Sequence, residues 1–132
     1  MPEYIVERII DALNTRSKSV KGSRLLILGV AYKKDIEDVR ESPALRVIEL
    51  LLEKKAAVHY HDPYISELKE ESYKLKSIKL EKKTVGSYDC VVILADHSCY
   101  DLNSVVKEAK LIFDTRGCTL GIKSDNIIRL GE

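Results

Sequence analysis

The stretch RLLILGVAYKKDIEDVRESPALRVIELLLEK, residues 24–54, decides the fold of this chain. Residues 24–30 form an apolar run that reaches a glycine near its end, which is typical of a buried parallel strand. Ser42 and Pro43 then mark a helix start, because a serine hydroxyl accepts an amide hydrogen bond at the N-cap and proline fits the first turn. The helix is expected over residues 43–54, with a wide apolar face.

The remaining sequence continues this alternation of strands and helices. Strands are expected over residues 57–61, 90–95 and 111–114, with a helix over residues 102–109 that Asp101 can cap. The charged stretch 69–83 is expected to hold a short helix and a minor strand. Alternating strands and helices predict right-handed crossovers and a parallel sheet covered on both faces. The expected fold class is therefore α/β, a Rossmann-like doubly wound parallel sheet.

An amphipathic helix is expected before the sheet, over residues 3–14. Ile5, Ile9 and Leu13 form one apolar stripe at helical spacing, and a polar connector follows over residues 17–23. Two interpretations are open. The helix docks on this domain, or it is the tail of an element that belongs to another domain.

Composition excludes several classes of protein. The chain has 132 residues, of which 45% are hydrophobic and 33% charged, and its net charge is +1, so a nucleic-acid-binding surface is not expected. No apolar run is long enough to span a membrane and no signal peptide opens the sequence. An odd count of three cysteines then indicates a reducing, cytoplasmic setting. The cysteines and histidines show no zinc-binding spacing, so no metal site is expected.

The loop after the first strand is the most unusual segment. Ligands bind at the carboxyl ends of the strands in such sheets, but this loop has only Gly29 where a dinucleotide-binding turn would carry GxGxxG. The sheet is therefore not expected to bind NAD in the usual way. Lys33, Lys34 and Arg40 instead lie beside a helix N-terminus, a place that favours anions. Four acidic residues share the loop, so a solvated loop that pairs its own charges is an equally open interpretation.

A second candidate site follows the strand at residues 111–114. Arg116 comes directly after this strand and can bind a phosphate with two hydrogen bonds, while Gly117 allows a close approach or a sharp turn. The alternative is a structural arginine paired with a neighbouring carboxylate such as Asp114. The sequence pattern does not choose between them.

Two further residue groups invite a functional interpretation that the spacing does not support. Cys99 follows His97 by two residues, yet an activated thiol needs a base held in the right geometry, and a loop at this spacing does not supply it. His97 is expected to bond the backbone at the strand end. Asp62 stands where a dinucleotide-binding sheet carries the acidic residue that binds the ribose. The favoured interpretation is nevertheless an aspartate that forms a turn before Pro63.

Four motifs together resemble a known family: GVAYKKDIEDVRESPALRVIELL, VHYHDPY, ADH and FDTRG, in this order. They are similar to the C-terminal domain of the UDP-glucose/GDP-mannose dehydrogenase family, closest to the branch that oxidises UDP-N-acetylhexosamines. The resemblance covers almost the whole chain. It implies that residues 1–20 are the end of the central interdomain helix with its connector, and that residues 21–132 are the UDP-sugar-binding domain.

The resemblance implies a role within a larger NAD-dependent UDP-sugar 6-dehydrogenase of polysaccharide biosynthesis. Such enzymes oxidise the sugar C6 alcohol to a carboxylate with two NAD+ per turnover, through a cysteine that has no counterpart in this sequence. The chain is therefore expected to bind a UDP-sugar and to be inactive alone, without a catalytic residue. The N-terminal domain of the same enzyme would bind most of the NAD, and the full-length protein is expected to be a homodimer.

The resemblance also assigns site residues. Tyr32, Lys33 and Arg116 match positions that face the UDP-sugar, and Arg40 matches a position that reaches the NAD. Two rival hypotheses remain open. The domain could be an assembly module that dimerises through the stripe of Ile5, Ile9 and Leu13, with little ligand binding of its own. It could also be a small enzyme that uses Cys99 and His97.

Overall fold

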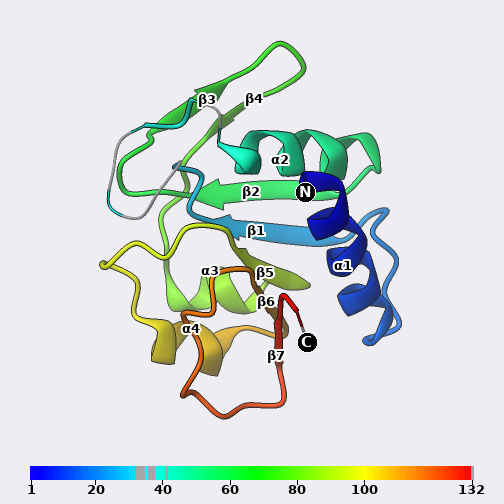
Figure 1. Ribbon diagram of the computed structural model, residues 1–132, viewed down its shortest axis with the longest axis vertical. Coiled ribbons are helices and arrows are strands. Elements are labelled where there is room, and N and C mark those ends of the chain that lie inside the picture. Colours follow the sequence, from blue (N-terminus) through cyan, green and yellow to red (C-terminus); the bar gives the residue numbers. More distant parts are fainter. Residues whose placement is uncertain (32–34, 36–37, 41, 132) are drawn as a thin grey trace.

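Parallel strands form the sheet at the centre of the computed structural model, which describes residues 1–31, 35, 38–40 and 42–131 (Figure 1). Their order across the sheet is β2-β1-β5-β6-β7, and each neighbouring pair is parallel. The strands are β1 (Arg24–Leu28), β2 (Ala57–His61), β5 (Cys90–Ile93), β6 (Ile112–Asp114) and β7 (Ile127–Arg129). The expected α/β sheet is confirmed, although β7 was not predicted from the sequence.

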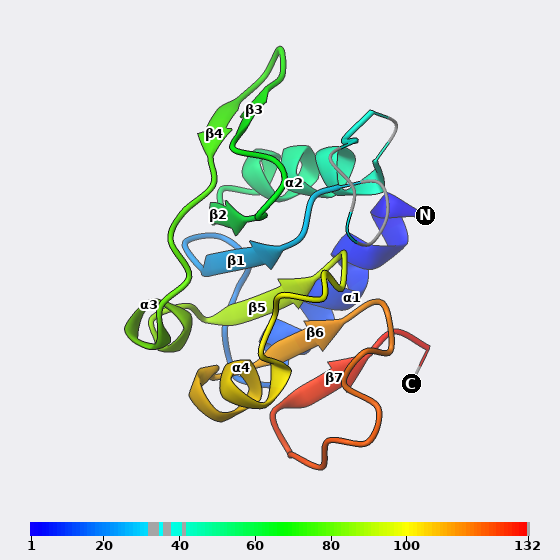
Figure 2. The same ribbon diagram turned by 90° about the vertical axis from the view of Figure 1, so that its left-hand side faces the viewer.

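Helices cover both faces of the sheet (Figures 1 and 2). They are α1 (Pro2–Asn14) and α2 (Pro43–Glu53) on one face, and α3 (Lys82–Gly86) and α4 (Leu102–Glu108) on the other. Side chains alternate along β1, so Leu25 and Ile27 join the core under α1 and α2, whereas Leu26 and Leu28 join the core under α3 and α4. A strand buried on both faces must be apolar at every position, which explains its sequence.

Helix α1 docks on this domain. Its stripe residues Ile5, Ile9 and Leu13 are only 6%, 0% and 0% exposed, and they pack into the same core as α2. The surface on which the dimerisation hypothesis rested is therefore already occupied within this chain. Whether α1 is the end of a longer interdomain helix stays a prediction.

A hairpin occupies part of the charged stretch. Its strands β3 (Glu67–Lys69) and β4 (Lys74–Lys76) are antiparallel, and Leu68 pairs with Leu75 between charged neighbours. The hairpin projects beyond α2 (Figure 2) and is held there by the Tyr73 hydroxyl, which donates to the Leu45 carbonyl at 3.0 Å. β4 agrees with the expected minor strand, whereas α3 begins only at Lys82, at the end of the stretch 69–83, and the pairing with β3 was not predicted.

The order of strands switches between β1 and β5: β2 lies on one side of β1, and the later strands are added on the other side. The loops after β1 and β5 approach each other at this point. Gly29 adopts a φ of +85°, and a Cβ added to it would lie 2.5 Å from the Ala95 carbonyl oxygen. Only glycine allows this approach. Such a reversal point at the carboxyl edge is where doubly wound sheets bind their ligands.

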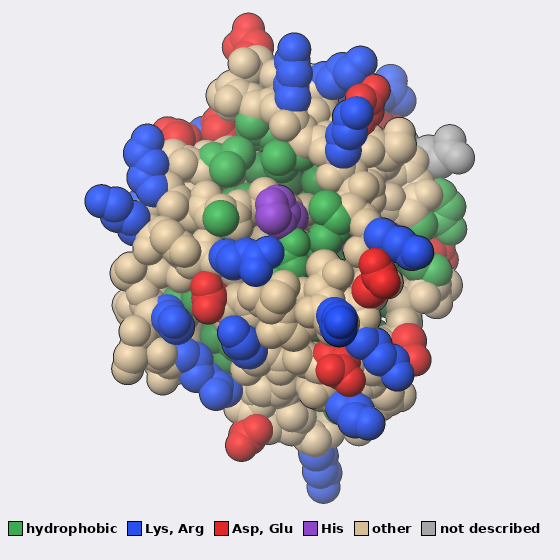
Figure 3. All heavy atoms as spheres, turned by 180° about the vertical axis from the view of Figure 1, so that it is seen from behind, with side chains coloured by type: hydrophobic (Ala, Val, Ile, Leu, Met, Phe, Trp, Pro, Cys, Tyr) green, Lys and Arg blue, Asp and Glu red, His purple; other side chains and the backbone are tan. Residues whose placement is uncertain are grey.

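Charged side chains are spread over the back of the molecule. Figure 3 shows Lys and Arg side chains interspersed with a smaller number of acidic ones, around a small hydrophobic patch that contains a histidine. The charges therefore do not gather into one continuous patch on this face. Within the described part of the chain, none of the helices has the length and apolar character needed to cross a membrane.

Candidate ligand site at the carboxyl edge

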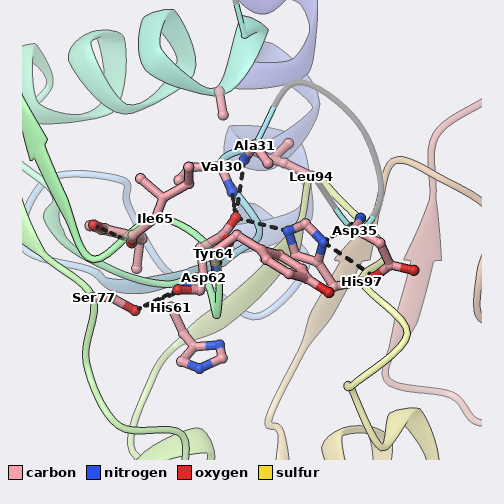
Figure 4. Close-up of polar contacts among 12 residues, drawn as sticks. Val30, Ala31, Asp35, His61, Asp62, Tyr64, Ile65, Ser77, Leu94 and His97 are labelled. Carbon is pink, nitrogen blue, oxygen red and sulfur yellow. Dashed lines mark hydrogen bonds and ion pairs between the residues drawn. The ribbon is translucent and has the colours of Figure 1, made fainter. Parts of the chain in front are cut away.

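The loop after β1 is described only in part. Tyr32, Lys33 and Lys34 lie outside the described residues, so their predicted roles stay predictions. The residues on either side of them are placed: Ala31 is buried, and Asp35 lies in the left-handed backbone region with a φ of +58°. Both lie at the carboxyl edge of the sheet, as the sequence predicts (Figure 4).

Arg40 is paired within its own loop. Its guanidinium donates from Nε to Asp38 Oδ1 and from Nη2 to Asp38 Oδ2, both at 3.1 Å. The hydrogen bond from this side chain lowers the pKa of Asp38. For Arg40, the self-paired interpretation therefore describes the structure of this chain. The Arg40 side chain is nonetheless 88% exposed, and an exposed pair contributes little stability, so another anion can compete for it.

Arg116 lines a pocket of about 190 Å³. Its Nε donates to the Leu94 carbonyl at 2.7 Å, which ties the side chain to the end of β5. The pocket is lined by α1, the first turn of α2, and the ends of β5, β6 and β7, through Met1, Ile5, Ser42, Pro43, Ala44, Leu94, Thr115, Arg116 and Leu130. The Ser42 hydroxyl caps α2 by accepting from the Ala44 amide at 3.3 Å. A guanidinium and a helix N-terminus, both favourable for an anion, thus border one pocket.

Asp114 does not pair with the Arg116 guanidinium. Its carboxylate accepts from the backbone N–H groups of Arg116 and Gly117 at 2.9 Å each, and from the amide and hydroxyl of Thr119. Gly117 has a φ of +73°, so this carboxylate closes a tight turn after β6. The alternative of an Asp114–Arg116 ion pair is therefore wrong. In the described part of the chain, the guanidinium pairs with no carboxylate.

Acid is expected to remove the contribution of Asp114 to stability. Burial acts to raise the pKa of this carboxyl, but the hydrogen bonds from Thr119, Arg116 and Gly117 outweigh it and hold the pKa below 3.8. The folded state therefore binds fewer protons, so the contribution is present above the ordinary pKa and is lost as pH falls through the lowered one. Urea unfolding of wild type and Asp114→Asn across this range should show the stability difference shrinking in acid. A difference that does not change with pH would contradict this assignment.

Asp62 and His97 form a buried pair beneath the loops, as Figure 4 shows. Asp62 Oδ2 accepts from the Val30 and Ala31 amides at 2.8 and 3.0 Å, and lies 2.9 Å from His97 Nε2. Asp62 Oδ1 accepts from the Tyr64 amide at 2.8 Å, which confirms the predicted turn. The contact between Asp62 and His97 was not predicted from the sequence. The only signal in the sequence was that each residue follows a predicted strand, β2 or β5, at the carboxyl edge, with β1 between the two strands.

Cys99 is not activated by His97. Nδ1 of His97 accepts from the Asp35 amide at 2.8 Å, and Nε2 faces Asp62, so both ring nitrogens have other partners. The Cys99 thiol has a raised pKa, caused mainly by burial, although the residue as a whole is exposed. A raised pKa disfavours the reactive thiolate at neutral pH. The hypothesis of a small enzyme based on these two residues therefore loses its chemical basis.

The family follows from a sequence comparison that spans most of the chain. Residues 26–120 match the model of the "UDP-glucose/GDP-mannose dehydrogenase family, UDP binding domain". The chain belongs to this family. The matched region contains the loop after β1, the Asp62–His97 pair and Arg116, whereas Met1, Ile5 and Leu130 of the pocket lie outside it.

Individual relatives agree with this assignment. A UDP-N-acetyl-D-mannosamine dehydrogenase of Methanococcus vannielii is 34% identical over 88% of this chain and 27% of its own length. A UDP-glucose 6-dehydrogenase of Rickettsia bellii is 28% identical over 98% of this chain and 30% of its own length. The solved structure of a UDP-D-ManNAc dehydrogenase from Pyrococcus horikoshii aligns with a TM-score of 0.76 at 25% identity, over 97% of this chain and 29% of that one. The chain thus spans about a quarter to a third of these relatives.

The described residues at the end of β1 and β2 do not offer the contacts of a usual dinucleotide-binding turn. The amides of Val30 and Ala31, which would face a pyrophosphate in a glycine-rich turn, donate to Asp62 instead. Asp62 is 2% exposed and its carboxylate is filled by internal donors, so it cannot hold a ribose. These contacts agree with the expectation that this sheet does not bind NAD in the usual way.

Proposed function

We propose that this chain is the UDP-sugar-binding domain of an NAD-dependent UDP-sugar 6-dehydrogenase, with a UDP-N-acetylhexosamine as substrate. The match to the family's UDP-binding domain and the names of the relatives support this proposal. The complete protein would oxidise the C6 alcohol to a carboxylate and use two NAD+ per turnover. We assign no catalytic residue to this chain and expect it to be inactive alone.

The observation that carries the proposal is the placement of Arg116 beside the N-terminus of α2. A UDP diphosphate carries about two negative charges, and a guanidinium can bind it with paired hydrogen bonds. Tyr32 and Lys33 are proposed to add contacts from the loop after β1. The pocket volume of about 190 Å³ is below the roughly 300–1,000 Å³ of most small-molecule sites, so it would hold only part of a UDP-sugar.

The remainder of the site is proposed to come from the N-terminal domain of the same enzyme. That domain would bind most of the NAD, and Arg40 would exchange its exposed contact with Asp38 for one with the cofactor. The relatives are three to four times longer than the matched segment, which leaves room for such a domain. A homodimeric full-length protein in the cytoplasm completes the proposal, with free thiols at Cys90, Cys99 and Cys118 in keeping with a reducing compartment.

A titration of the 132-residue chain with UDP, followed by backbone amide NMR, tests the proposed function. Shifts should cluster at residues 32–43 and 114–117. These segments contain Ser42 and Arg116, which line the pocket, and the proposed contact residues Tyr32 and Lys33. Shifts that cluster elsewhere would contradict the site. An absence of shifts at millimolar UDP, repeated in the full-length enzyme, would contradict the function itself.

Replacing Arg116 or Lys33 with alanine should weaken UDP binding by about tenfold or more for each residue. A hydrogen bond to a charged group contributes about 1.5–3 kcal/mol, which corresponds to at least a tenfold change in Kd. Lys107→Ala is the matched control. This substitution also removes one positive charge, but Lys107 lies in the last turn of α4, away from the pocket. Calorimetric titration of the variants, in the chain and in the full-length enzyme, measures the effect. Unchanged affinity in Arg116→Ala and Lys33→Ala would show that the site assignment is wrong.

A further inference from the structure

A histidine with both ring nitrogens engaged connects three loops at the carboxyl edge. Figure 4 shows the His97 ring between Asp62, which follows β2, and Asp35, which belongs to the loop after β1. Nε2 lies 2.9 Å from Asp62 Oδ2, and Nδ1 lies 2.8 Å from the Asp35 amide nitrogen. The His97 side chain is 0% exposed, so these contacts are not exchanged with water.

The partners of His97 assign its proton. The Asp35 amide is a donor, so Nδ1 must accept, and the carboxylate of Asp62 is an acceptor, so Nε2 must donate. A neutral imidazole with its proton on Nε2 satisfies both contacts, whereas the other tautomer satisfies neither. Asp62 therefore orients the ring, and the oriented ring presents one acceptor to the loop.

Asp35 is held from a second direction. Its carboxylate accepts from the Ser98 amide at 2.8 Å and from the Ser98 hydroxyl at 2.6 Å. Asp35 has a φ of +58°, a conformation that few residues other than glycine adopt. Two contacts from its side chain and one from its backbone, all to the loop after β5, stabilise this unusual conformation.

The same Asp62–His97 pair also holds the loop at its start. Ala31 donates to Asp62 Oδ2 and Asp35 donates to His97 Nδ1, so the loop is attached on both sides of residues 32–34. The rings of Tyr64 and Tyr100 lie 5.0 and 5.8 Å from the His97 ring and confine it. Residues that are held in place before a ligand arrives lose less conformational entropy on binding, and Ala31 and Asp35 are held in this way.

We propose that His97 is a positioning residue for the nucleotide site: through Nδ1 it holds Asp35, which directly follows the residues 32–34 that are proposed to contact UDP. This inference rests on the proposed function, because it concerns the affinity of the same site for UDP. It assigns to a buried residue outside the pocket a role in ligand affinity that is separate from its role in stability.

Two substitutions of His97 separate these roles. In His97→Gln the side-chain amide reaches the Nε2 position and can still donate to Asp62, but the acceptor for Asp35 is lost. In His97→Asn the side-chain oxygen lies near the Nδ1 position and can accept from Asp35, but the donor to Asp62 is lost. If His97 acts through Nδ1, the two variants should rank in opposite ways by stability and by UDP affinity. The glutamine variant should keep more stability, and the asparagine variant should keep more UDP affinity.

The measurements are the Kd for UDP, the urea-unfolding midpoint, and hydrogen exchange of the Asp35 amide in the 132-residue chain. His97→Gln should raise the Kd about tenfold and speed exchange, whereas His97→Asn should keep the Kd within about twofold of wild type. If UDP affinity instead follows stability in both variants, or changes in neither, the positioning role is refuted. A ¹⁵N spectrum of the imidazole showing the proton on Nδ1 would refute it as well.

Ser98→Ala gives a test that does not depend on buried substitutions, because Ser98 is exposed. Loss of its hydroxyl contact with Asp35 should speed exchange of the Asp35 amide and raise the Kd for UDP about threefold, with stability near wild type. Unchanged exchange and unchanged Kd would contradict the proposal. Wild-type protein that does not bind UDP would refute the proposed function, whereas binding that is insensitive to His97→Gln and Ser98→Ala would refute only the inference.

Discussion

Replacing Asp62 with alanine is expected to lower the free energy of unfolding by about 3–5 kcal/mol, because several buried donors lose their acceptor at once. The amides of Val30 and Ala31 and the Nε2 of His97 all donate to one oxygen of this carboxylate. These residues are at most 2% exposed, so water cannot take the place of the carboxylate without rearrangement. Urea unfolding followed by circular dichroism measures the loss, which is a large part of a typical domain stability of about 5–15 kcal/mol.

Asp62→Asn is the matched control for this prediction. The buried donors all use Oδ2, whereas Oδ1 accepts from the amide of Tyr64, a residue that is 40% exposed. An asparagine whose oxygen takes the Oδ2 position keeps the buried contacts and loses the one nearest to solvent, at a cost of about 1 kcal/mol. Equal losses in the alanine and asparagine variants would show that the negative charge, and not the set of hydrogen bonds, is what stabilises this edge.

Replacing Gly29 with alanine is expected to destabilise the fold by about 2–5 kcal/mol. A φ of +85° costs about 1–2 kcal/mol for a residue with a Cβ, and the added atom would lie 2.5 Å from the backbone oxygen of Ala95. The neighbour is backbone of the loop after the adjacent strand, so it cannot rotate away as a side chain would. Relief requires the loops after β1 and β5 to separate, and UDP affinity should fall together with stability.

Gly22→Ala separates the backbone part of this effect from the steric part. Gly22 has nearly the same φ, +83°, but a Cβ there would meet no described atom within 4 Å. Its cost should be limited to the backbone conformation, about 1–2 kcal/mol. Urea unfolding of both variants gives the contribution of the contact with Ala95 as the difference. Equal destabilisation would show that the two loops can separate freely at this point.

The fold could be predicted from local patterns because each pattern has a local cause. The apolar run before Gly29, the Ser42-Pro43 helix start and the Asp101 cap all reflect backbone chemistry within a few residues. Strand ends were predicted too late, at residues 30 and 95, because composition does not show where a ladder stops. Val30 continues the apolar pattern of the strand, but its amide donates to the side chain of Asp62.

The contacts of the candidate site depend on residues far apart in sequence, so they could not be predicted in the same way. The positions of Arg40 and Arg116 at the carboxyl edge follow from the order of strands, but their partners do not. Asp38 and Asp114 were both candidates to pair with an arginine, and only Asp38 does so, because Asp114 is occupied by backbone donors. Strand β7 was missed because its three residues carry a weak apolar pattern, and β6 alone holds it in the sheet.

The position of β1 between β2 and β5 limits how this chain can acquire its fold. Both neighbours of β1 are distant in sequence, since Leu25 pairs with Val58 on one side and with Cys90 on the other. Neither strand pair can form from residues close in sequence. In each case a long loop must close, at a cost in conformational entropy, before the contacts between the strands can offset that cost. The carboxyl edge is therefore not expected to be formed in an early fragment of the chain that has only local structure. We expect it to form only when β1, β2 and β5 have come together, so the ligand site should appear together with the fold.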